Sequence, residues 1–343
     1  MENEHYGLTG RPFQLTPDPD FWFESATHRK AMAYLGYGLV LGEGFIVITG
    51  EVGAGKTTLV GHLLETIDPS RVEAIQLSST LIRGEDVLVL LASAMGVMTT
   101  PTDRAHALTI IEDQLAARAR AGKRLLIVVD EVQNMTIGAI EELRMISNFN
   151  SGSLPVVQFL LLGQPEFKET LASPLLEQLR QRVIASHHLT PMDQDEIQTY
   201  IEHRLSHVGW KGTPRIAADA PATIFRATDG VPRRVNLVMT RALLMAALED
   251  SDEISARHID AVVSDLSHEE NDGRPSLGPK PEPETLARVQ FTDDAVALDI
   301  AARVTMLEAQ VAEQEAALRH VLNLLIDWVE GENTARRVPS SVA

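Results

Sequence analysis

One stretch constrains the fold of this 343-residue chain more than any other: Gly50 to Thr57, with the sequence GEVGAGKT. It fits the pattern of a glycine, four further residues, a second glycine, a lysine and a serine or threonine. The preceding apolar run, Phe45 to Thr49, predicts a buried strand, and Thr58 to Leu64 predicts the start of a helix. Backbone N–H groups and a helix N-terminus then face the same point, which suits an anion. The sequence therefore predicts a phosphate-binding loop.

A second motif gives this loop its chemistry. The apolar run Leu125 to Val129 ends in two carboxylates, Asp130 and Glu131. In phosphate-loop enzymes such a strand lies beside the strand of the loop. We therefore expect Thr57 and Asp130 to hold Mg²⁺, Lys56 to reach the β- and γ-phosphates, and Glu131 to polarise the attacking water. The alternative is a strand that simply ends in exposed acids. The sequence contains no Asn-Lys-x-Asp element for guanine, which favours ATP.

Strand and helix patterns alternate from Gly44 to about Leu189. The predicted strands are Phe45–Thr49, Val72–Leu77, Leu125–Val129, Val156–Leu162 and Val183–Leu189. Helical patterns lie between them, for instance over Ala105–Ala121 and Ile137–Ser147. This alternation predicts an α/β fold of the P-loop NTPase type, with a mostly parallel sheet and helices on both faces. After Pro191 the pattern predicts only helices, over Asp193–Val208, Pro221–Ala227, Arg233–Leu248 and Ser255–Leu266.

Composition and pattern divide the chain into six predicted segments. Residues 1–43 are a lead-in with one helix, 44–190 the α/β core and 191–267 a small helical lid. Residues 268–297 form an acidic, proline-rich linker, 298–330 a coiled-coil segment and 331–343 a disordered tail. From Ile300 to Trp328 the a/d positions recur at alternating spacings of four and three, with Gln314 as one polar exception. The pattern favours self-association; the alternative is one amphipathic helix on the protein's own surface.

Composition limits where the chain works and what it contacts. It has no cysteine, which excludes disulfides and thiolate metal sites. The first residues lack the basic and apolar regions of a signal peptide, and no apolar run approaches the length of a membrane span. We expect a cytoplasmic protein that reaches the inner membrane only through a partner. The formal net charge of −18 disfavours non-specific contact with nucleic acid.

Two sets of arginines are candidates for contact with a phosphate. Arg180 and Arg182 precede the fifth strand, and Arg233 follows a Gly-Val-Pro turn. A guanidinium delivered to the γ-phosphate accelerates its hydrolysis. The alternative for each is a solvated arginine or an ordinary ion pair. His203 and His207, four residues apart on a predicted helix, fit a helix-surface pair better than a metal site.

Together these motifs resemble a AAA+ ATPase, and the lead-in is similar to the general secretion pathway A-type ATPases. The resemblance is closest to the branch found with exosortase/PEP-CTERM exopolysaccharide loci and covers about residues 4 to 265. The motifs that carry it are Tyr6-Gly7-Leu8, Pro12-Phe13, Thr16-Pro17-Asp18-Pro19, Gly42-Glu43-Gly44-Phe45, Asp130-Glu131-Val132-Gln133-Asn134, Glu141-Glu142-Leu143-Arg144, Gly163-Gln164-Pro165-Glu166-Phe167 and Tyr200-Ile201-Glu202-His203-Arg204-Leu205.

The resemblance implies ATP and Mg²⁺ as cofactors and a role for each matching residue. Arg233 matches an arginine that senses the γ-phosphate within its own subunit, and Arg180 or Arg182 matches a finger that enters a neighbouring subunit's site. Gln164 stands at a sensor position where the wider superfamily usually has Asn or Thr. Tyr6 and Phe13 would contribute to an adenine pocket. The implied nucleotide-binding residues are Gly50, Glu51, Val52, Gly53, Ala54, Gly55, Lys56, Thr57, Thr58 and Gln164.

The sequence thus predicts an ATPase that hydrolyses ATP at subunit interfaces of a homo-oligomer. By resemblance, it serves assembly or regulation of an envelope polysaccharide or protein export system, with a protein partner and without nucleic acid. A DNA-binding ATPase of the transposition type is the first alternative. The second is a nucleotide-dependent scaffold without significant turnover.

Overall fold

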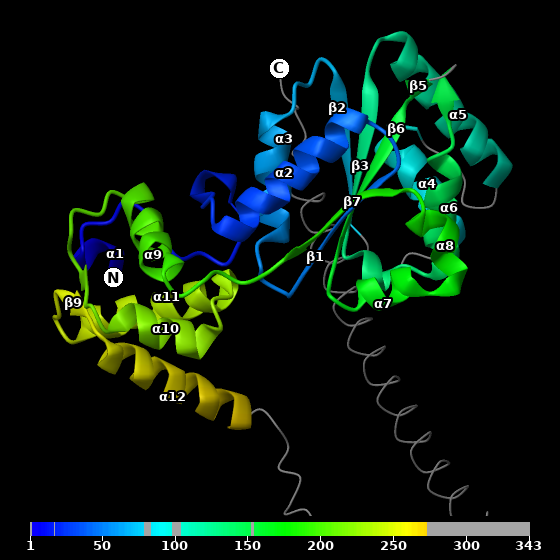
Figure 1. Cartoon of the computed structure of the whole chain (residues 1–343). Coiled ribbons are helices and arrows are strands. Elements are labelled where there is room, and N and C mark those ends of the chain that lie inside the picture. Colours follow the sequence, from blue (N-terminus) through cyan, green and yellow to red (C-terminus); the bar gives the residue numbers. More distant parts are fainter. Residues whose placement is uncertain (1, 17, 79–83, 98–103, 152–153, 273–343) are drawn as a thin grey trace, which may run out of the picture. The chain divides into compact units, whose positions relative to one another are not determined.

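The computed structural model describes residues 2–16, 18–78, 84–97, 104–151 and 154–272, which belong to one compact unit (Figure 1). The predicted coiled-coil segment, 298–330, and the predicted tail, 331–343, lie outside these residues. The predicted boundaries between the segments stay predictions.

A five-stranded parallel sheet organises the first part of the chain. Its order is β2 (Val72–Ser78), β3 (Arg124–Asp130), β6 (Val157–Gly163), β1 (Phe45–Gly50) and β7 (Val183–Leu189). The strand carrying the loop, β1, pairs with β6 on one side and β7 on the other. Because all strands are parallel, Gly50, Asp130 and Gly163 end at the same edge of the sheet. This edge gathers the residues that follow β1, β3 and β6.

Helices cover both faces of this sheet, as predicted (Figure 1). They are α2 (Ala26–Leu41), α3 (Lys56–Thr66), α4 (Gly84–Ala94), α5 (Arg104–Arg120), α6 (Ile137–Ile146), α7 (Phe167–Ala172) and α8 (Glu177–Arg180). Successive side chains of β1 lie on opposite faces of the sheet. Phe45 joins the cluster built with α4 to α8, whereas Ile46 joins the cluster built with α2 and α3. Both side chains are fully buried, and each burial contributes about 1.5–3 kcal/mol to stability.

The later part of the chain is helical. It consists of α9 (Glu196–His207), α10 (Ala220–Thr228), α11 (Pro232–Leu248) and α12 (Ala256–Asp272), with the short strands β8 (Arg215–Ile216) and β9 (Glu253–Ile254). Two predicted boundaries were wrong. Helix α9 begins at Glu196 rather than Asp193, and the Glu196 carboxylate accepts from the N–H groups of Asp193 and Ala26. Helix α12 continues into the predicted linker to Asp272, and on it Glu269 pairs with Arg241 of α11 at 2.8 Å.

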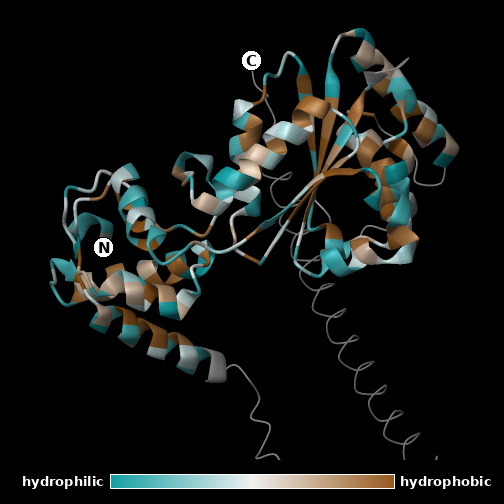
Figure 2. Ribbon diagram, viewed as in Figure 1, coloured by the Kyte–Doolittle hydropathy of each residue, from teal (hydrophilic) through white to brown (hydrophobic). Residues whose placement is uncertain are grey.

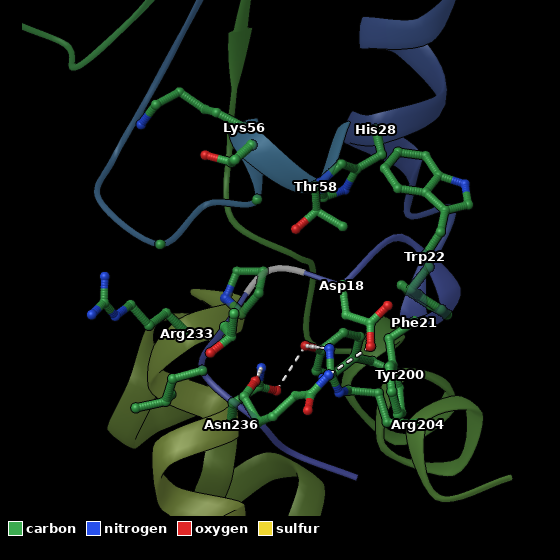
Figure 3. A pocket seen from close by; sticks show the side chains of 18 of the residues that line it. Asp18, Phe21, Trp22, His28, Lys56, Thr58, Tyr200, Arg204, Arg233 and Asn236 are labelled. Atoms are coloured by element: carbon green, nitrogen blue, oxygen red, sulfur yellow. Dashed lines mark hydrogen bonds between the residues drawn. The ribbon is translucent and has the colours of Figure 1, made fainter. Parts of the chain in front are cut away.

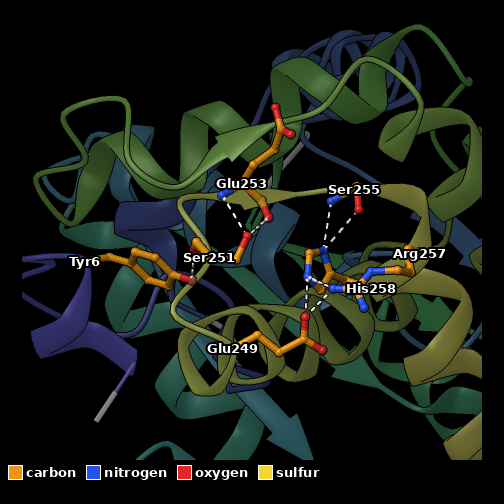
Figure 4. A network of polar contacts seen from close by, with 7 residues as sticks. All are labelled: Tyr6, Glu249, Ser251, Glu253, Ser255, Arg257 and His258. Carbon is orange, nitrogen blue, oxygen red and sulfur yellow. Dashed lines mark hydrogen bonds and ion pairs between the residues drawn. The ribbon is translucent and has the colours of Figure 1, made fainter.

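The N-terminal lead-in packs into these later helices. Tyr6, Leu8 and Phe13 are buried in one hydrophobic cluster with α9, α10, α11 and α12. The Tyr6 hydroxyl donates to the carbonyl of Ser251 at 2.9 Å (Figure 4), and burial, with Asp252 and Asp250 nearby, raises the pKa of Tyr6 to about 12. The prediction that Tyr6 and Phe13 help to form an adenine pocket was wrong, because neither is among the residues that line the cavity beside the phosphate-binding loop.

The start of α12 is held by a small polar network beside that contact (Figure 4). The N–H of Ser255 donates to His258 Nδ1 at 3.1 Å, and His258 Nε2 lies 3.4 Å from the Glu249 carboxylate. Glu249 also forms an ion pair with Arg257. Colouring by hydropathy shows the polar residues of α12 on one side and apolar residues on the other (Figure 2). None of the helices described for this chain combines the length and apolar character that crossing a bilayer demands.

Candidate functional site

The predicted phosphate-binding loop connects β1 to α3 at the carboxyl edge of the sheet. Gly53 and Gly55 adopt φ angles of 85° and 94°, a region that favours glycine. A Cβ at Gly55 would lie 2.7 Å from His28 Nε2, and one at Gly53 would lie 2.4 Å from Arg233 Cβ. Helix α3 begins at Lys56 with Gly55 as its N-cap and without a side-chain cap, so its first N–H groups face the loop. This arrangement suits a phosphate group.

Lys56 and Thr57 point to neighbouring parts of the same edge. Lys56 is buried, and its Nζ donates to the carbonyls of Gly50 at 2.7 Å and Glu51 at 3.0 Å. Burial lowers the pKa of Lys56, although nearby carboxylates oppose this shift. The Thr57 hydroxyl donates to Asp130 Oδ2 at 3.3 Å. The structure thus brings together the two residues predicted to hold Mg²⁺, and their hydroxyl and carboxylate oxygens fit a hard cation.

Glu131 follows β3 in the left-handed region of the backbone, at φ 54°. Its Oε2 accepts from Gln164 Nε2 at 3.0 Å and from Gln133 Nε2, and Gln133 Oε1 in turn accepts from the Gln164 N–H at 3.0 Å. Burial raises the pKa of Glu131, but these amide donors and the Lys56 charge outweigh it and lower the pKa below its usual value. Glu131 is therefore a carboxylate at neutral pH, fixed beside the phosphate-binding loop.

Gln133 is a residue whose place at the site the sequence did not predict. It stands in the short 3₁₀ helix η2 (Val132–Asn134), directly after Glu131. In the sequence, Gln133 stands out only as one residue of the motif Asp130-Glu131-Val132-Gln133-Asn134, and no role was predicted for it. Gln164, in contrast, lies where the sequence placed it, just after β6.

An aromatic cavity continues from the loop toward the lead-in and the later helices (Figure 3). Trp22 lies edge-on to His28, with 5.1 Å between ring centroids, and stacks on His62 at 4.4 Å. On the other wall, the Tyr200 hydroxyl donates to Asn236 Oδ1 at 2.8 Å. Among the residues that line the cavity are Phe21, Trp22, His28, Lys56, Thr57, Thr58, Glu131, Tyr200, Arg204, Arg233 and Asn236. The cavity thus joins a polar end at the loop to an aromatic end.

His28 is fixed in one orientation at the junction of these two ends. Its Nδ1 lies 2.6 Å from the Ser25 hydroxyl, which also accepts the His28 N–H at 3.3 Å. The two contacts with Ser25 hold the ring in this orientation whichever of the two partners donates. The ring Nε2 faces the loop at Gly55. Burial lowers the pKa of His28 from 6.5 to about 4, so the ring is neutral at pH 7.

The buried, neutral His28 predicts a loss of stability in acid. Below pH 6.5 the unfolded chain binds a proton at this residue, while the folded chain does not until about pH 4. Stability therefore falls as pH drops through this window, by about 3 kcal/mol at pH 4. In urea unfolding, His28→Asn should remove this part of the pH dependence. The matched variant His268→Asn, at an exposed position, should keep it; equal slopes for both variants would contradict the assignment.

The three predicted arginines occupy different places. Arg233 lines the cavity, and its backbone N–H donates to the Gly53 carbonyl at 3.2 Å. Arg180 is exposed and donates to the carbonyl of Ala172 at 3.1 Å, whereas the half-buried Arg182 donates to Ser147 Oγ at 3.0 Å. Within the described part of one chain, neither Arg180 nor Arg182 lines the cavity that holds Lys56.

The two histidines of α9 also have structural partners. His203 Nε2 lies 2.7 Å from the Trp22 carbonyl, and its ring meets that of His207 edge-on at 4.5 Å. No group of three potential metal ligands occurs among the residues that the structure describes.

Comparison with known proteins gives a family match and several similar folds. Residues 40–171 match the family model described as AAA domain. General secretion pathway protein A of Aeromonas hydrophila is 34% identical over 277 residues, which are 80% of this chain and 50% of that protein. The chain thus spans about half the length of this curated relative.

Among solved structures, the ADP form of the Aeropyrum pernix ORC2 protein is 20% identical with a TM-score of 0.52, over 69% of this chain and 67% of that one. Cdc6p from Pyrobaculum aerophilum is 14% identical with a TM-score of 0.57, over 80% and 75%. At these identities the likeness shows the fold alone.

Proposed function

Because the chain has the P-loop AAA+ fold, which implies nucleotide binding, we propose that it is an ATPase that uses ATP and Mg²⁺. One observation carries this proposal: Thr57 meets Asp130, and Glu131 meets Gln164, at the edge where the loop begins. The direct test is steady-state release of phosphate from ATP with Mg²⁺, compared with release after chelation by EDTA. No release above the rate of uncatalysed hydrolysis would contradict the proposal.

In this proposal each residue at this edge of the sheet has a separate role. Lys56 exchanges its bonds to the Gly50 and Glu51 carbonyls for bonds to the β- and γ-phosphates. Thr57 and Asp130 hold the cation. When bound, Mg²⁺ supplies positive charge that offsets the charge developing on the transferred phosphoryl group.

In this proposal Glu131 is the general base that activates the attacking water. Its carboxylate accepts a proton from the water, while the amides of Gln133 and Gln164 hold it in place. Its position next to the loop supports hydrolysis over the alternative of a scaffold that binds nucleotide without turnover.

The aromatic end of the cavity suits the base of the nucleotide. Trp22 offers a flat apolar face, and Nε2 of His28 offers a polar nitrogen next to the loop. Tyr200 and Asn236 close the opposite wall. We assign this end to adenine and ribose, in place of Tyr6 and Phe13.

We also propose that the site is completed by a second copy of the chain. Arg180 is the better candidate for the arginine that enters a neighbouring site, because its side chain is exposed. Arg182 is held by Ser147 and serves packing in this assignment. Arg233 already lines the cavity and acts within its own subunit.

Mixing two variants tests whether Arg180 of one subunit acts at the nucleotide site of another. Arg180→Ala should lower phosphate release about 10- to 100-fold, as expected for one charge-assisted contact of about 1.5–3 kcal/mol. Adding Lys56→Ala subunits, which are inactive themselves but keep Arg180, should restore part of the rate. Arg182→Ala serves as the matched comparison and should show no such recovery. Absence of recovery with Arg180→Ala at every mixing ratio would place Arg180 in a structural role.

The similarity to general secretion pathway protein A supports a link to secretion. We propose that the ATPase acts with a protein partner of an envelope export system, and that the exosortase-linked exopolysaccharide machinery is that system. The net charge of −18 argues against the alternative of a DNA-binding ATPase. ATP-dependent binding of duplex DNA at physiological ionic strength would favour that alternative, and capture of an export component by the Glu131→Gln variant would favour the proposal.

A further inference from the structure

The end of α2 carries apolar side chains that the described structure leaves exposed over a large part of their surface. Tyr37, Val40 and Leu41 are 60%, 81% and 43% exposed. On the opposite side of the same helix, Ala31 and Leu35 are fully buried against the sheet. Helix α2 therefore has a second apolar face, which does not serve the core.

Basic residues stand next to this face. Arg71 precedes β2 and Arg124 begins β3, and the Arg124 N–H donates to the Arg71 carbonyl at 2.9 Å. Helix α5 ends at Arg120, and Lys123 follows it with its N–H bonded to the carbonyl of Arg118. Arg120 and Arg71 are exposed, and Lys123 and Arg124 are partly exposed.

The apolar residues of α2 and the basic residues meet at Arg124. Helix α2 ends at Leu41 with Gly42 as its C-cap, at φ 75°, and a Cβ on Gly42 would lie 1.6 Å from Nη1 of Arg124. The Arg124 side chain thus lies directly against the end of the helix that carries Val40 and Leu41. We call this surface the basic-apolar edge and define it as Tyr37, Val40, Leu41, Arg71, Arg120, Lys123 and Arg124.

The charge of this edge stays positive after its acids are counted. Arg118 forms an ion pair with Glu73 at 2.8 Å, so the two charges cancel and do not change the local net charge. Asp68 lies 4.0 Å from Arg71, with both side chains largely exposed, and Glu43 is the exposed acid next to Gly42. Four cations against two weakly engaged acids leave a local positive charge in a chain whose formal net charge is −18.

The edge lies away from the nucleotide site. Arg71 and Arg124 mark the amino-terminal ends of β2 and β3, whereas the phosphate-binding loop and Glu131 follow carboxyl-terminal ends (Figure 1). A large partner could occupy the edge without blocking the cavity at Lys56.

We propose that the basic-apolar edge docks on an anionic phospholipid bilayer. Cations paired with exposed aromatic and aliphatic side chains match the boundary between phosphate headgroups and acyl chains. Arginine and lysine contact the headgroup phosphates, and Tyr37, Val40 and Leu41 enter the apolar boundary. A nucleic acid would match the cations but leave the three apolar side chains without a partner. The inference does not rest on the proposed ATPase activity.

Sedimentation of the full chain with vesicles tests the docking. We expect binding to vesicles of phosphatidylcholine with 30% phosphatidylglycerol, weak binding to phosphatidylcholine alone, and release by salt; the mixture is about 30% anionic so that its surface attracts basic segments. Each cation near such a surface contributes about fivefold to binding. Because a reversal both removes an attraction and adds a repulsion, Arg71→Glu with Arg120→Glu should weaken binding by at least about 25-fold.

Two further variants separate the contributions. Lys211→Glu with Arg215→Glu reverses two exposed charges elsewhere and should retain binding. Val40→Ser with Leu41→Ser should lower binding even at low salt, because it removes the apolar part. All variants should keep phosphate release, so a loss of vesicle binding is distinguishable from a failure of the ATPase assignment.

Three outcomes would overturn the proposal. The first is no binding to anionic vesicles at low salt. The second is equal loss in the edge pair and the control pair, which would reflect total charge only. The third combines two results: the original chain does not bind vesicles, and Val40→Ser with Leu41→Ser has a smaller particle mass than the original chain in light scattering. These results would assign the edge to contact between copies of the chain.

Discussion

Lys56→Ala is expected to abolish nucleotide binding at micromolar ATP while the chain stays folded. The ammonium group would contact two phosphates, and losing each charge-assisted hydrogen bond costs about 1.5–3 kcal/mol, so affinity should fall by at least about 100-fold. The fold should tolerate the change, because within the described residues the hydrogen bonds of Lys56 Nζ go to the Gly50 and Glu51 carbonyls of its own loop. Titration calorimetry with ATP and thermal unfolding by circular dichroism measure the two effects separately.

A matched variant makes this result specific. Lys211→Ala removes an exposed lysine outside the site and should leave ATP affinity within about twofold of the original, as expected for a distant surface charge. Retained affinity in Lys56→Ala would refute the role of the loop. A large drop in its melting temperature would instead show that the lysine holds the loop together.

Glu131→Gln is expected to stop turnover but keep ATP bound. Removing the base should lower phosphate release about 100- to 10,000-fold, the usual contribution of general base catalysis. Glutamine keeps the shape of the side chain and its oxygen can still accept from Gln164 and Gln133. Binding of ATP should therefore be unchanged, and the variant should hold ATP long enough to trap partners.

The pH profile provides a second measurement of the same residue. Since the pKa of Glu131 lies below its usual value, the base is ionised across the neutral range. Phosphate release should therefore stay level from about pH 5.5 upward as far as this residue is concerned. The control Glu169→Gln changes an exposed acid on α7 and should leave both rate and profile unchanged. If Glu131→Gln released phosphate at the original rate, the assignment of the base would fail.

Much of the α/β part followed from local patterns. The apolar runs of β1, β3 and β6 are fully buried strands, and buried parallel strands read as continuous apolar runs. The contact between Thr57 and Asp130 followed as well, because parallel strands end at a common edge. The predicted start of α3, at Thr58, was two residues too late. The glycines of the preceding loop suggested that the loop continued, whereas the helix already begins at Lys56.

What the sequence failed to predict depends on contacts between distant segments. Gln133 joins the site through Gln164, and a glutamine in a short loop helix leaves no periodic signal. The extension of α12 coincides with the pairing of Glu269 with Arg241. Phe21, Trp22 and Phe23 are consecutive aromatic residues in the sequence, but nothing local indicates that Trp22 stacks on His62. The a/d repeat from Ile300 to Trp328 stays a prediction.

The bond from Tyr6 to the carbonyl of Ser251 has a consequence for how the protein is made. The two residues are 245 positions apart, and Phe13 and Leu8 share the same core with α9 to α12. During synthesis the first residues leave the ribosome long before their partners exist. The α/β core can fold as a unit in the meantime, whereas Tyr6, Leu8 and Phe13 must wait for α9 to α12 with their apolar side chains uncovered. Contacts between residues so far apart in the sequence raise the contact order, so this part of the core is expected to form late in folding.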